Sequence, residues 1–362
     1  MCNLWDISAD QEVCKVLIEF NSIDIFEKYI KYAHGVYPRA VEILIGILGN
    51  IAIVDKSICE KILNNQTLVK FFVEVLFYDL NDTQTTIQIL RLFNTFFLNE
   101  ENMREFLNSF EADTDFINFI NYLLDQSLNQ ELLELLVEYI VNLFDVNETI
   151  LKNFSSNPTF LESLLNSMMT SYNAAAKQSS EKDEPDDAEP ISFEVLDSIY
   201  KNYFVCLQFL STCEDGVKNL CTINRILLQI FAIYATKFLN YFDDTFASNI
   251  YFKNEIFIKN FECYFSVVNV VFANSSKNYL NLDSTDECLI SYKSVLSDLI
   301  QVSIRFLKLT KSIENNDAVK FKFAFNLVQE FSSYLDDEEN KFLNDQSNNL
   351  KVSLNGAKNK FE

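Results

Sequence analysis

Three apolar segments of this chain each carry one asparagine, at nearly equal intervals. They are Leu48-Gly49-Asn50-Ile51, Phe93-Asn94-Thr95-Phe96 and Val141-Asn142-Leu143-Phe144. Twelve positions after each asparagine stands Ile62, Phe106 or Phe154, and twenty-two positions after it stands Phe72, Phe116 or Leu164. The three asparagines therefore occupy equivalent positions of one internal repeat.

The length of the repeat indicates its kind. The asparagines lie 44 and 48 residues apart, which matches an armadillo or HEAT unit of two or three helices. A helix of such a unit cannot bury its apolar face alone, so successive units stack on one another. The chain also has only 5 Gly and 4 Pro in 362 residues, too few for the tight turns of a sheet protein. The sequence predicts an all-α fold, an armadillo/HEAT-like right-handed α-solenoid of stacked helical repeats.

Changes in composition predict four segments. Residues 1–172 carry the N-terminal armadillo-like repeats, and helical periodicity resumes over 193–340 as further repeats of the same solenoid. Between them, 173–192 is predicted to be a disordered acidic loop, because 174–187 has no aromatic or branched aliphatic residue. The last segment, 341–362, is predicted to be a polar tail that frays.

The formal net charge of −23 bears on the class of partner. Nucleic acids and anionic membranes require clusters of Lys and Arg, and here the basic residues occur as scattered pairs. An acidic surface suits a basic or neutral peptide. The charge also has a plainer explanation, since it keeps a long solenoid soluble.

The cysteines and apolar runs predict a reducing compartment, nucleus or cytosol. The 8 Cys lie mostly within apolar helical stretches without a repeated close spacing, as core thiols do. The apolar runs 41–54, 226–235 and 263–273 are interrupted by polar residues and shorter than the ~20 residues that a bilayer requires. We also expect no secretory segment, because the first residues reach Asp6 without a basic start or an apolar run.

No catalytic, cofactor-binding or metal-binding residue is predicted, and we expect that the protein is not an enzyme. His34 is the single histidine, and its position beside Gly35 at a helix end indicates a capping or surface role. Gly46 and Gly49 lack the preceding strand of a phosphate-binding loop, so they favour close helix packing.

Asn50, Asn94 and Asn142 are the candidate binding residues. The third helix of each armadillo unit lines a concave groove, where an asparagine amide can both donate to and accept from the main chain of an extended peptide. The alternative is that these asparagines only hydrogen-bond to backbone groups between helices. Because the chain is rich in Asn, three aligned asparagines are also less improbable than they look. Trp5 likewise has two interpretations: a cap on the first unit, which we favour, or an aromatic contact for a partner.

The N-terminal third of the chain resembles the serum amyloid A-like 1 family, also called synoviocyte proliferation-associated protein. The residues that carry the resemblance are Cys2-Asn3-Leu4-Trp5-Asp6, Glu19-Phe20-Asn21, Asp24-Ile25, Pro38-Arg39, Glu42-Ile43, Gly46-Ile47-Leu48-Gly49-Asn50-Ile51-Ala52 and Ile58-Cys59-Glu60. The resemblance is close over about the first 110 residues. It implies an armadillo-like, non-enzymatic, nuclear protein connected with cell proliferation. Relatives carry an acidic stretch before the segment at Trp5, so we expect a short isoform or an incomplete gene model.

We therefore expect a scaffold that binds protein or extended peptide partners in its concave face, in the nucleus or alternatively the cytoplasm. One rival is an import-adaptor-like receptor for basic extended peptides, which the acidic charge favours. The single Trp weakens this rival, because classical adaptors place several Trp beside Asn along the groove. The sequence does not indicate an oligomeric state.

Overall fold

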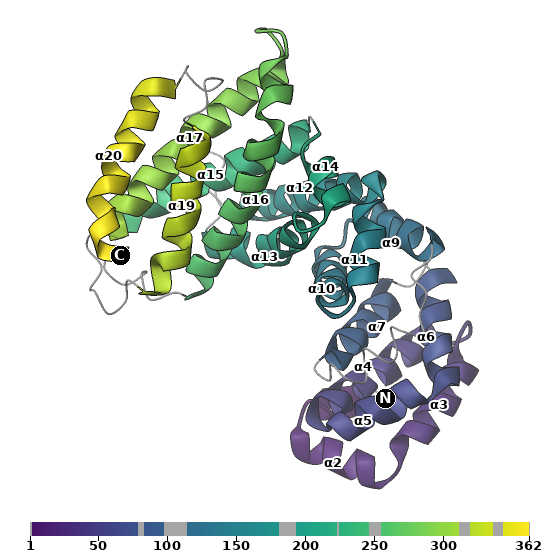
Figure 1. Ribbon diagram of the computed structural model, residues 1–362. Helices are drawn as coiled ribbons and strands as arrows, with labels where there is room; N and C mark the ends of the chain where they lie inside the picture. Colours follow the sequence, from purple (N-terminus) through teal and green to yellow (C-terminus); the bar gives the residue numbers. More distant parts are fainter. Residues whose placement is uncertain are drawn as a thin grey trace. The chain divides into compact units, whose positions relative to one another are not determined.

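The computed structural model describes residues 2–78, 83–97, 114–180, 193–222, 224–245, 255–310, 319–335 and 343–361. Every regular element among these residues is a helix, which confirms the predicted all-α class (Figure 1). Contacts divide the chain into two compact units, residues 1–154 and 155–362. The two units are described separately below.

The first unit is a series of helices in which those that carry the repeated asparagines pack side by side. Its described helices are α1 (Cys2–Ile7), α2 (Gln11–Glu19), α3 (Ser22–Ala33), α4 (Pro38–Val54), α5 (Lys56–Asn64), α6 (Gln66–Tyr78), α7 (Thr83–Phe96), α9 (Thr114–Gln126), α10 (Gln130–Val146) and α11 (Glu148–Ser155). Helix α4 lies against α7, and α7 lies against α10. Helices α1, α2 and α3 cover other parts of α4.

The repeat frame predicted from sequence matches the pattern of burial. Ile62 on α5 and Phe72 on α6 are completely buried, and so is Phe154 on α11. Phe116 on α9 is 1% exposed, whereas Phe106 lies outside the described residues. Each asparagine helix is thus followed at a fixed interval by residues that are buried in the core.

Helix α4 forms the centre of the first unit because its sequence is apolar on almost every face. Pro38 begins the helix, where its missing N–H costs nothing. From Val41 to Gly49 every residue is buried, including the carboxylate-bearing Glu42. Such a helix is stable only when neighbours surround it, which α1, α2, α3 and α7 do.

The second unit consists of two rows of helices. Its described elements are α12 (Pro158–Ser180), α13 (Phe193–Leu210), α14 (Glu214–Leu220), α15 (Arg225–Thr245), α16 (Glu255–Leu280), α17 (Glu287–Thr310), η2 (Val319–Phe321), α19 (Lys322–Tyr334) and α20 (Asn344–Phe361). One row runs α13, α16, α19, and the other runs α15, α17, α20. Contacts of α16 with α17 and of α19 with α20 join the rows. This order of neighbours is that of stacked helical pairs.

Two segment boundaries differ from the sequence prediction. Helix α12 continues to Ser180, so 173–180 is helical, while 181–192 lies outside the described residues. The stretch 174–177 is Ala-Ala-Ala-Lys, and these residues favour a helix without needing a large apolar face. The structural division falls between residues 154 and 155, ahead of the predicted loop, because α12 packs with α13, α14 and α15.

The predicted polar tail is wrong for residues 344–361, which form α20 and pack against α17 and α19. Residues with little or no exposure recur along it at Leu343, Leu350, Leu354, Ala357 and Phe361. These intervals of seven, four and three residues place one narrow apolar stripe on the helix. Polar residues on the other faces hide this stripe in the average composition.

The cysteines are thiols, as the sequence predicts. Cys14, Cys59, Cys206 and Cys221 are buried, and none of the cysteines described forms a disulfide. Burial raises the pKa of Cys221 to about 11, so this thiol stays protonated at neutral pH. In the described part of the chain, no helix is both long enough and apolar enough to cross a bilayer.

We expect the apolar stripe of α20 to contribute to folding. Leu350 is completely buried, and Leu350→Ala should lower the free energy of unfolding by about 2–5 kcal/mol through lost burial and the cavity left behind. Val352 on the same helix is 71% exposed, so Val352→Ala should change it by less than about 0.5 kcal/mol. Urea denaturation of both variants measures the difference. Equal, small effects would mean that α20 is not part of the folded unit.

Candidate functional site

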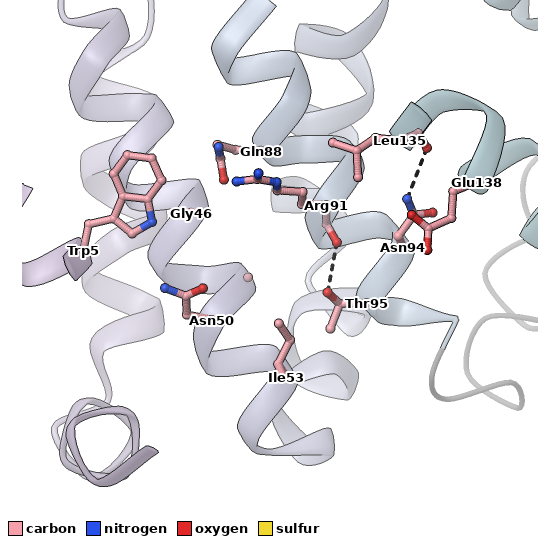
Figure 2. A pocket seen from close by; sticks show the side chains of 11 residues that line it. Trp5, Gly46, Asn50, Ile53, Gln88, Arg91, Asn94, Thr95, Leu135 and Glu138 are labelled. Atoms are coloured by element: carbon pink, nitrogen blue, oxygen red, sulfur yellow. Dashed lines mark hydrogen bonds between the residues drawn. The ribbon is translucent and has the colours of Figure 1, made fainter. Parts of the chain in front are cut away.

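An open groove runs along the first unit across α4, α7 and α10 (Figure 2). Its volume is about 510 Å³. The residues that line it are Trp5, Gly46, Gly49, Asn50, Ile53, Gln88, Arg91, Asn94, Thr95, Leu135 and Glu138. The groove therefore brings together two of the three predicted asparagines and the single tryptophan.

The spacing of the lining residues shows that each helix turns one face to the groove. On α4 they are four residues at i, i+3, i+4 and i+7, namely Gly46, Gly49, Asn50 and Ile53. On α10 they are Leu135 and Glu138, three positions apart. Residues at such intervals share one side of a helix. The stacking of α4, α7 and α10 is what joins these faces into one surface.

Trp5 forms one end of the groove. Helix α1 packs on α4, and the half-buried indole ring lies directly over Gly46. A Cβ atom at position 46 would come within 2.7 Å of Trp5 Nε1, so only glycine permits this approach. The ring covers the first repeat helix, as the cap interpretation predicts, and it also faces the groove, as the aromatic-contact interpretation predicts.

Arg39 adds a charge to this end of the groove. Its guanidinium carbon lies 5.4 Å from the centre of the Trp5 ring, a cation–π distance. Its other partner is the carboxylate of Glu42, with which it forms an ion pair. The buried Glu42 is thus neutralised within the chain, and one position at the Trp5 ring is taken by the protein's own cation.

Asn50 links α4 to the first helix. Its Nδ2 donates to Ser8 Oγ at 2.9 Å, and Ser8 Oγ donates to the Trp5 carbonyl at 2.7 Å. These two hydrogen bonds hold the end of α1, and with it Trp5, against α4. Asn50 itself is half-buried and lines the groove.

Asn94 and Asn142 are hydrogen-bonded to each other. Asn142 Nδ2 donates to Asn94 Oδ1 at 3.2 Å, and Asn94 Nδ2 donates to the Leu135 carbonyl at 3.2 Å. Asn94 lines the groove, whereas Asn142 is not among its lining residues. The asparagines therefore do connect neighbouring helices, as the alternative interpretation predicts, and two of the three also reach the groove.

The charged residues that line the groove are Arg91 and Glu138. Arg91 forms an ion pair with Glu131, and the Arg91 carbonyl accepts from Thr95 Oγ1 at 2.9 Å. Glu138 also has an interaction partner. The large negative charge of the chain is therefore not concentrated in this groove.

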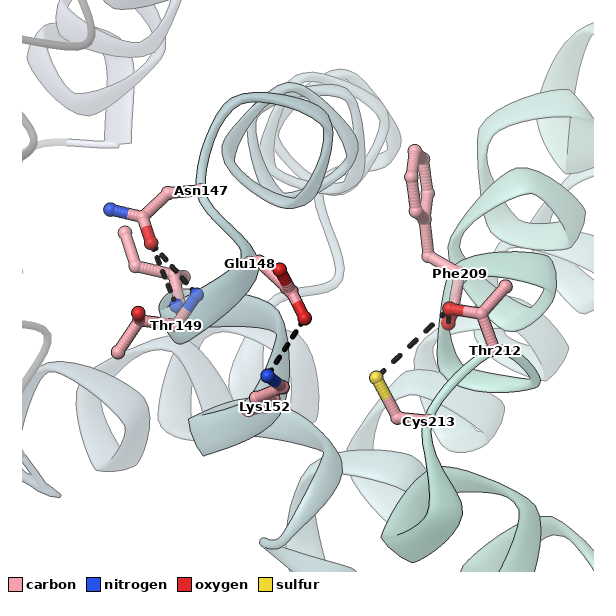
Figure 3. A network of polar contacts seen from close by, with 8 residues as sticks. Asn147, Glu148, Thr149, Lys152, Phe209, Thr212 and Cys213 are labelled. Carbon is pink, nitrogen blue, oxygen red and sulfur yellow. Dashed lines mark hydrogen bonds and ion pairs between the residues drawn. The ribbon is translucent and has the colours of Figure 1, made fainter.

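Many other asparagines of the chain have a different, local role. At the start of α11, Asn147 Oδ1 accepts from the N–H groups of Thr149 and Ile150 at 2.9 and 3.1 Å (Figure 3). Asn65, Asn129, Asn157 and Asn224 cap helices in the same way, each accepting from the N–H three residues on. Capping of helix starts is thus the role of these asparagines. The asparagines at mid-helix positions need a separate explanation.

Sequence reasoning missed Gln88, Arg91 and Ile53. Gln88 is only 5% exposed, and within the described parts of the chain its amide makes no hydrogen bond. Gln88, Arg91 and Thr95 lie at i, i+3 and i+7 on α7. This spacing places them on the side of the helix that carries Asn94, and it could have identified them from the sequence. The repeat frame alone does not show which polar residues face the groove.

His34 and Gly35 occupy the helix end that the sequence predicts for them. His34 is the C-cap of α3, and Gly35 has a φ of +77°, the left-handed conformation that favours glycine. The imidazole packs edge-on against Phe71 with ring centres 5.0 Å apart. Among the residues that the structure describes, no group of three or more His, Cys, Asp or Glu is placed to hold a metal ion.

Comparison with curated proteins confirms the family resemblance. The chain is 26% identical to Protein SAAL1 of Homo sapiens over 232 residues, which cover 60% of this chain and 44% of that protein. It is 28% identical to Protein saal1 of Danio rerio over 232 residues, and 29% identical to Protein SAAL1 of Mus musculus over 151 residues. The similarity is thus longer than the first 110 residues noted from the sequence motifs. No family model matches the chain.

The matched region spans less than half of each relative. It covers 44% of the human and zebrafish proteins and 31% of the mouse protein. The names of these relatives state no activity. The role of this chain must therefore be argued from its own groove.

The contact between Trp5 and Gly46 gives a direct test of the groove's geometry. Gly46→Ala should push the indole away, because the new methyl would lie 2.7 Å from Nε1. Since Trp5 is the single tryptophan, we expect a red shift of its fluorescence and stronger acrylamide quenching. Overpacking should also cost about 1–3 kcal/mol of unfolding free energy, partly offset by the better helix propensity of alanine.

Gly49→Ala is the matched control, three residues along the same helix. A Cβ at position 49 meets nothing within 4 Å, so the Trp5 fluorescence should not change. Alanine should instead raise the free energy of unfolding by up to about 1 kcal/mol. Identical spectra for the Gly46→Ala variant and the wild type would contradict the position of Trp5.

Proposed function

From the resemblance to the serum amyloid A-like 1 proteins and the groove of the first unit, we propose that this chain is a non-enzymatic protein-interaction scaffold of armadillo type. An extended segment of a protein partner lies in the groove and is held by its main chain. The observation that carries the proposal is that Asn50 and Asn94, equivalent positions of successive repeats, line one groove together with Trp5.

The asparagine amides retain capacity for a ligand. A carboxamide offers two N–H donors and an oxygen with two lone pairs. Asn94 donates one N–H to the Leu135 carbonyl and accepts one hydrogen bond from Asn142. Asn50 donates one N–H to Ser8. The remaining donor and acceptor of each amide suit a peptide main chain, which alternates C=O and N–H groups.

The groove favours a neutral segment over a strongly basic one. A receptor for basic peptides needs unpaired carboxylates and free aromatic faces for Lys or Arg. Here Arg39 already lies over the Trp5 ring, and Arg91 is placed in the groove itself. The import-adaptor-like rival therefore has support from the net charge of the whole chain and not from the groove.

The absence of an enzymatic role is part of the proposal. The groove is lined by amides, a tryptophan and paired charges, and the single histidine, His34, is not among its residues. Acyl- or proton-transfer chemistry uses a nucleophile or base that is activated by a neighbour. The residues of this groove instead suit binding through hydrogen bonds and apolar contact.

Replacing all three asparagines by alanine tests the proposal. The probe is a fluorescein-labelled peptide that is selected on the immobilised full chain from a random displayed library, and its affinity is measured by fluorescence anisotropy. Each groove asparagine should contribute about 0.5–1.5 kcal/mol, so the Kd should rise about 2- to 12-fold for each one removed. Asn118→Ala, an exposed site on α9, is the matched control and should leave Kd unchanged.

Stability and affinity measured together separate the two interpretations of the asparagines. Because each asparagine also bonds within the chain, the triple variant should lose unfolding free energy under either interpretation. If the asparagines also bind the partner, the variant should lose peptide affinity under conditions where circular dichroism shows it to be folded. A folded triple variant with undiminished peptide affinity would eliminate the groove proposal.

We propose the nucleus as the place of action and a connection with cell proliferation, both implied by the family resemblance. The full chain fused to a fluorescent protein should accumulate in the nuclei of the native cells. Exclusion of the fusion from nuclei would leave the cytoplasm, the alternative compartment.

A further inference from the structure

Gly49 has no structural reason to be glycine. In the interior of a helix, glycine costs about 0.5–1 kcal/mol relative to alanine. At Gly46 the Trp5 ring explains this cost, but the Cβ position of Gly49 has nothing within 4 Å. Gly49 lines the groove, so the open space beside it belongs to the groove. Glycine at this position thus lowers the stability of the helix and leaves an open slot in the groove.

The walls of this slot are apolar. Ile53 lies one turn further along α4 and is 62% exposed, although the residues before it on that helix are almost all buried. Trp5 stands over Gly46, one turn in the other direction. A slot with a glycine floor between an isoleucine and an indole suits one aliphatic side chain.

Gln88 supplies the polar part of the same site. Its side chain lies on α7 between Trp5 and Arg91 in Figure 2 and lines the groove. The residue as a whole is 5% exposed, and within the described residues its amide makes no hydrogen bond. The amide atoms are not among the buried polar atoms that lack a partner, so they remain open to the groove. A ligand in the groove can therefore supply a donor and an acceptor to this amide.

The charges around the slot exclude a charged ligand group. Arg91 forms an ion pair with Glu131, and Arg39 forms one with the buried Glu42, so each arginine already has a carboxylate partner within the chain. A charged ligand group would therefore find its opposite charge already paired within the chain. The groups that remain available are neutral hydrogen-bonding amides and apolar surface.

We propose that Gln88 and Gly49 form a subsite for one residue of the bound partner segment. The Gln88 amide hydrogen-bonds the main chain of that residue, and the slot over Gly49, between Trp5 and Ile53, receives its aliphatic side chain. The ligand is thus a neutral extended peptide with one obligatory Val, Leu or Ile. This inference rests on the proposed function and specifies what the groove selects.

The test uses the full chain and the peptide library described above. Selected peptides should share one aliphatic residue, and its replacement by alanine should weaken binding about tenfold. Gly49→Ala fills the slot without disturbing the fold, so it should raise the urea midpoint while raising Kd for the aliphatic peptide about tenfold or more. Gln88→Ala should raise Kd about 2- to 12-fold under conditions where circular dichroism shows the variant to be folded. Asn118→Ala again serves as the control.

A double-mutant cycle tests whether the slot is the cause of the lost affinity. If the added methyl of Gly49→Ala competes with the aliphatic side chain, this variant should bind the alanine-substituted peptide as tightly as the wild type does. An equal loss of affinity for both peptides would mean that the aliphatic residue binds elsewhere, and it would overturn the subsite.

The remaining outcomes separate the subsite from the function. Some peptides could bind the triple asparagine variant less tightly but bind the Gly49→Ala and Gln88→Ala variants as tightly as the wild type. That result would overturn the subsite and leave the proposed function standing. A library that yields no peptide affecting Trp5 fluorescence would overturn both.

Discussion

The packing of α4 against α7, and of α7 against α10, is the interaction on which the first unit depends. Helix α4 buries nearly its whole surface, so it is stable only between neighbours that are themselves amphipathic. The same packing sets equivalent residues of successive repeats beside one another. The groove is therefore a direct result of the stacking that stabilises the fold.

Trp5 and Gly46 set how α1 lies against α4. The indole rests on a backbone position that has no side chain, and α1 packs on α4 there. Asn50 also fixes α1 through Ser8, so an amide of the groove contributes to this packing. The proposed binding and the packing of α1 involve the same residues, which is why each experiment on the groove needs a stability measurement beside it.

Much of the fold follows from the sequence because helix formation and burial depend on local patterns. The repeated asparagine frame correctly placed Ile62, Phe72, Phe116 and Phe154 in the core. The tail was misjudged because average composition conceals a stripe such as that of Leu350, Leu354 and Ala357. The extension of α12 was missed because alanine favours a helix while contributing little apolar surface.

Residue type and spacing along the chain were enough to identify the helical class, the repeat interval and the candidates Trp5, Asn50 and Asn94. Tertiary packing was needed to show that Asn142 bonds to Asn94 and lies outside the groove lining, and that Gln88 makes no hydrogen bond within the described residues. Tertiary packing also distinguishes Gly46, which Trp5 covers, from Gly49, whose Cβ position meets nothing within 4 Å, although the two look alike in sequence. The reason is physical: a hydrogen bond, a vacancy or a close approach depends on which helix lies opposite, and that partner is more than forty residues away in the chain.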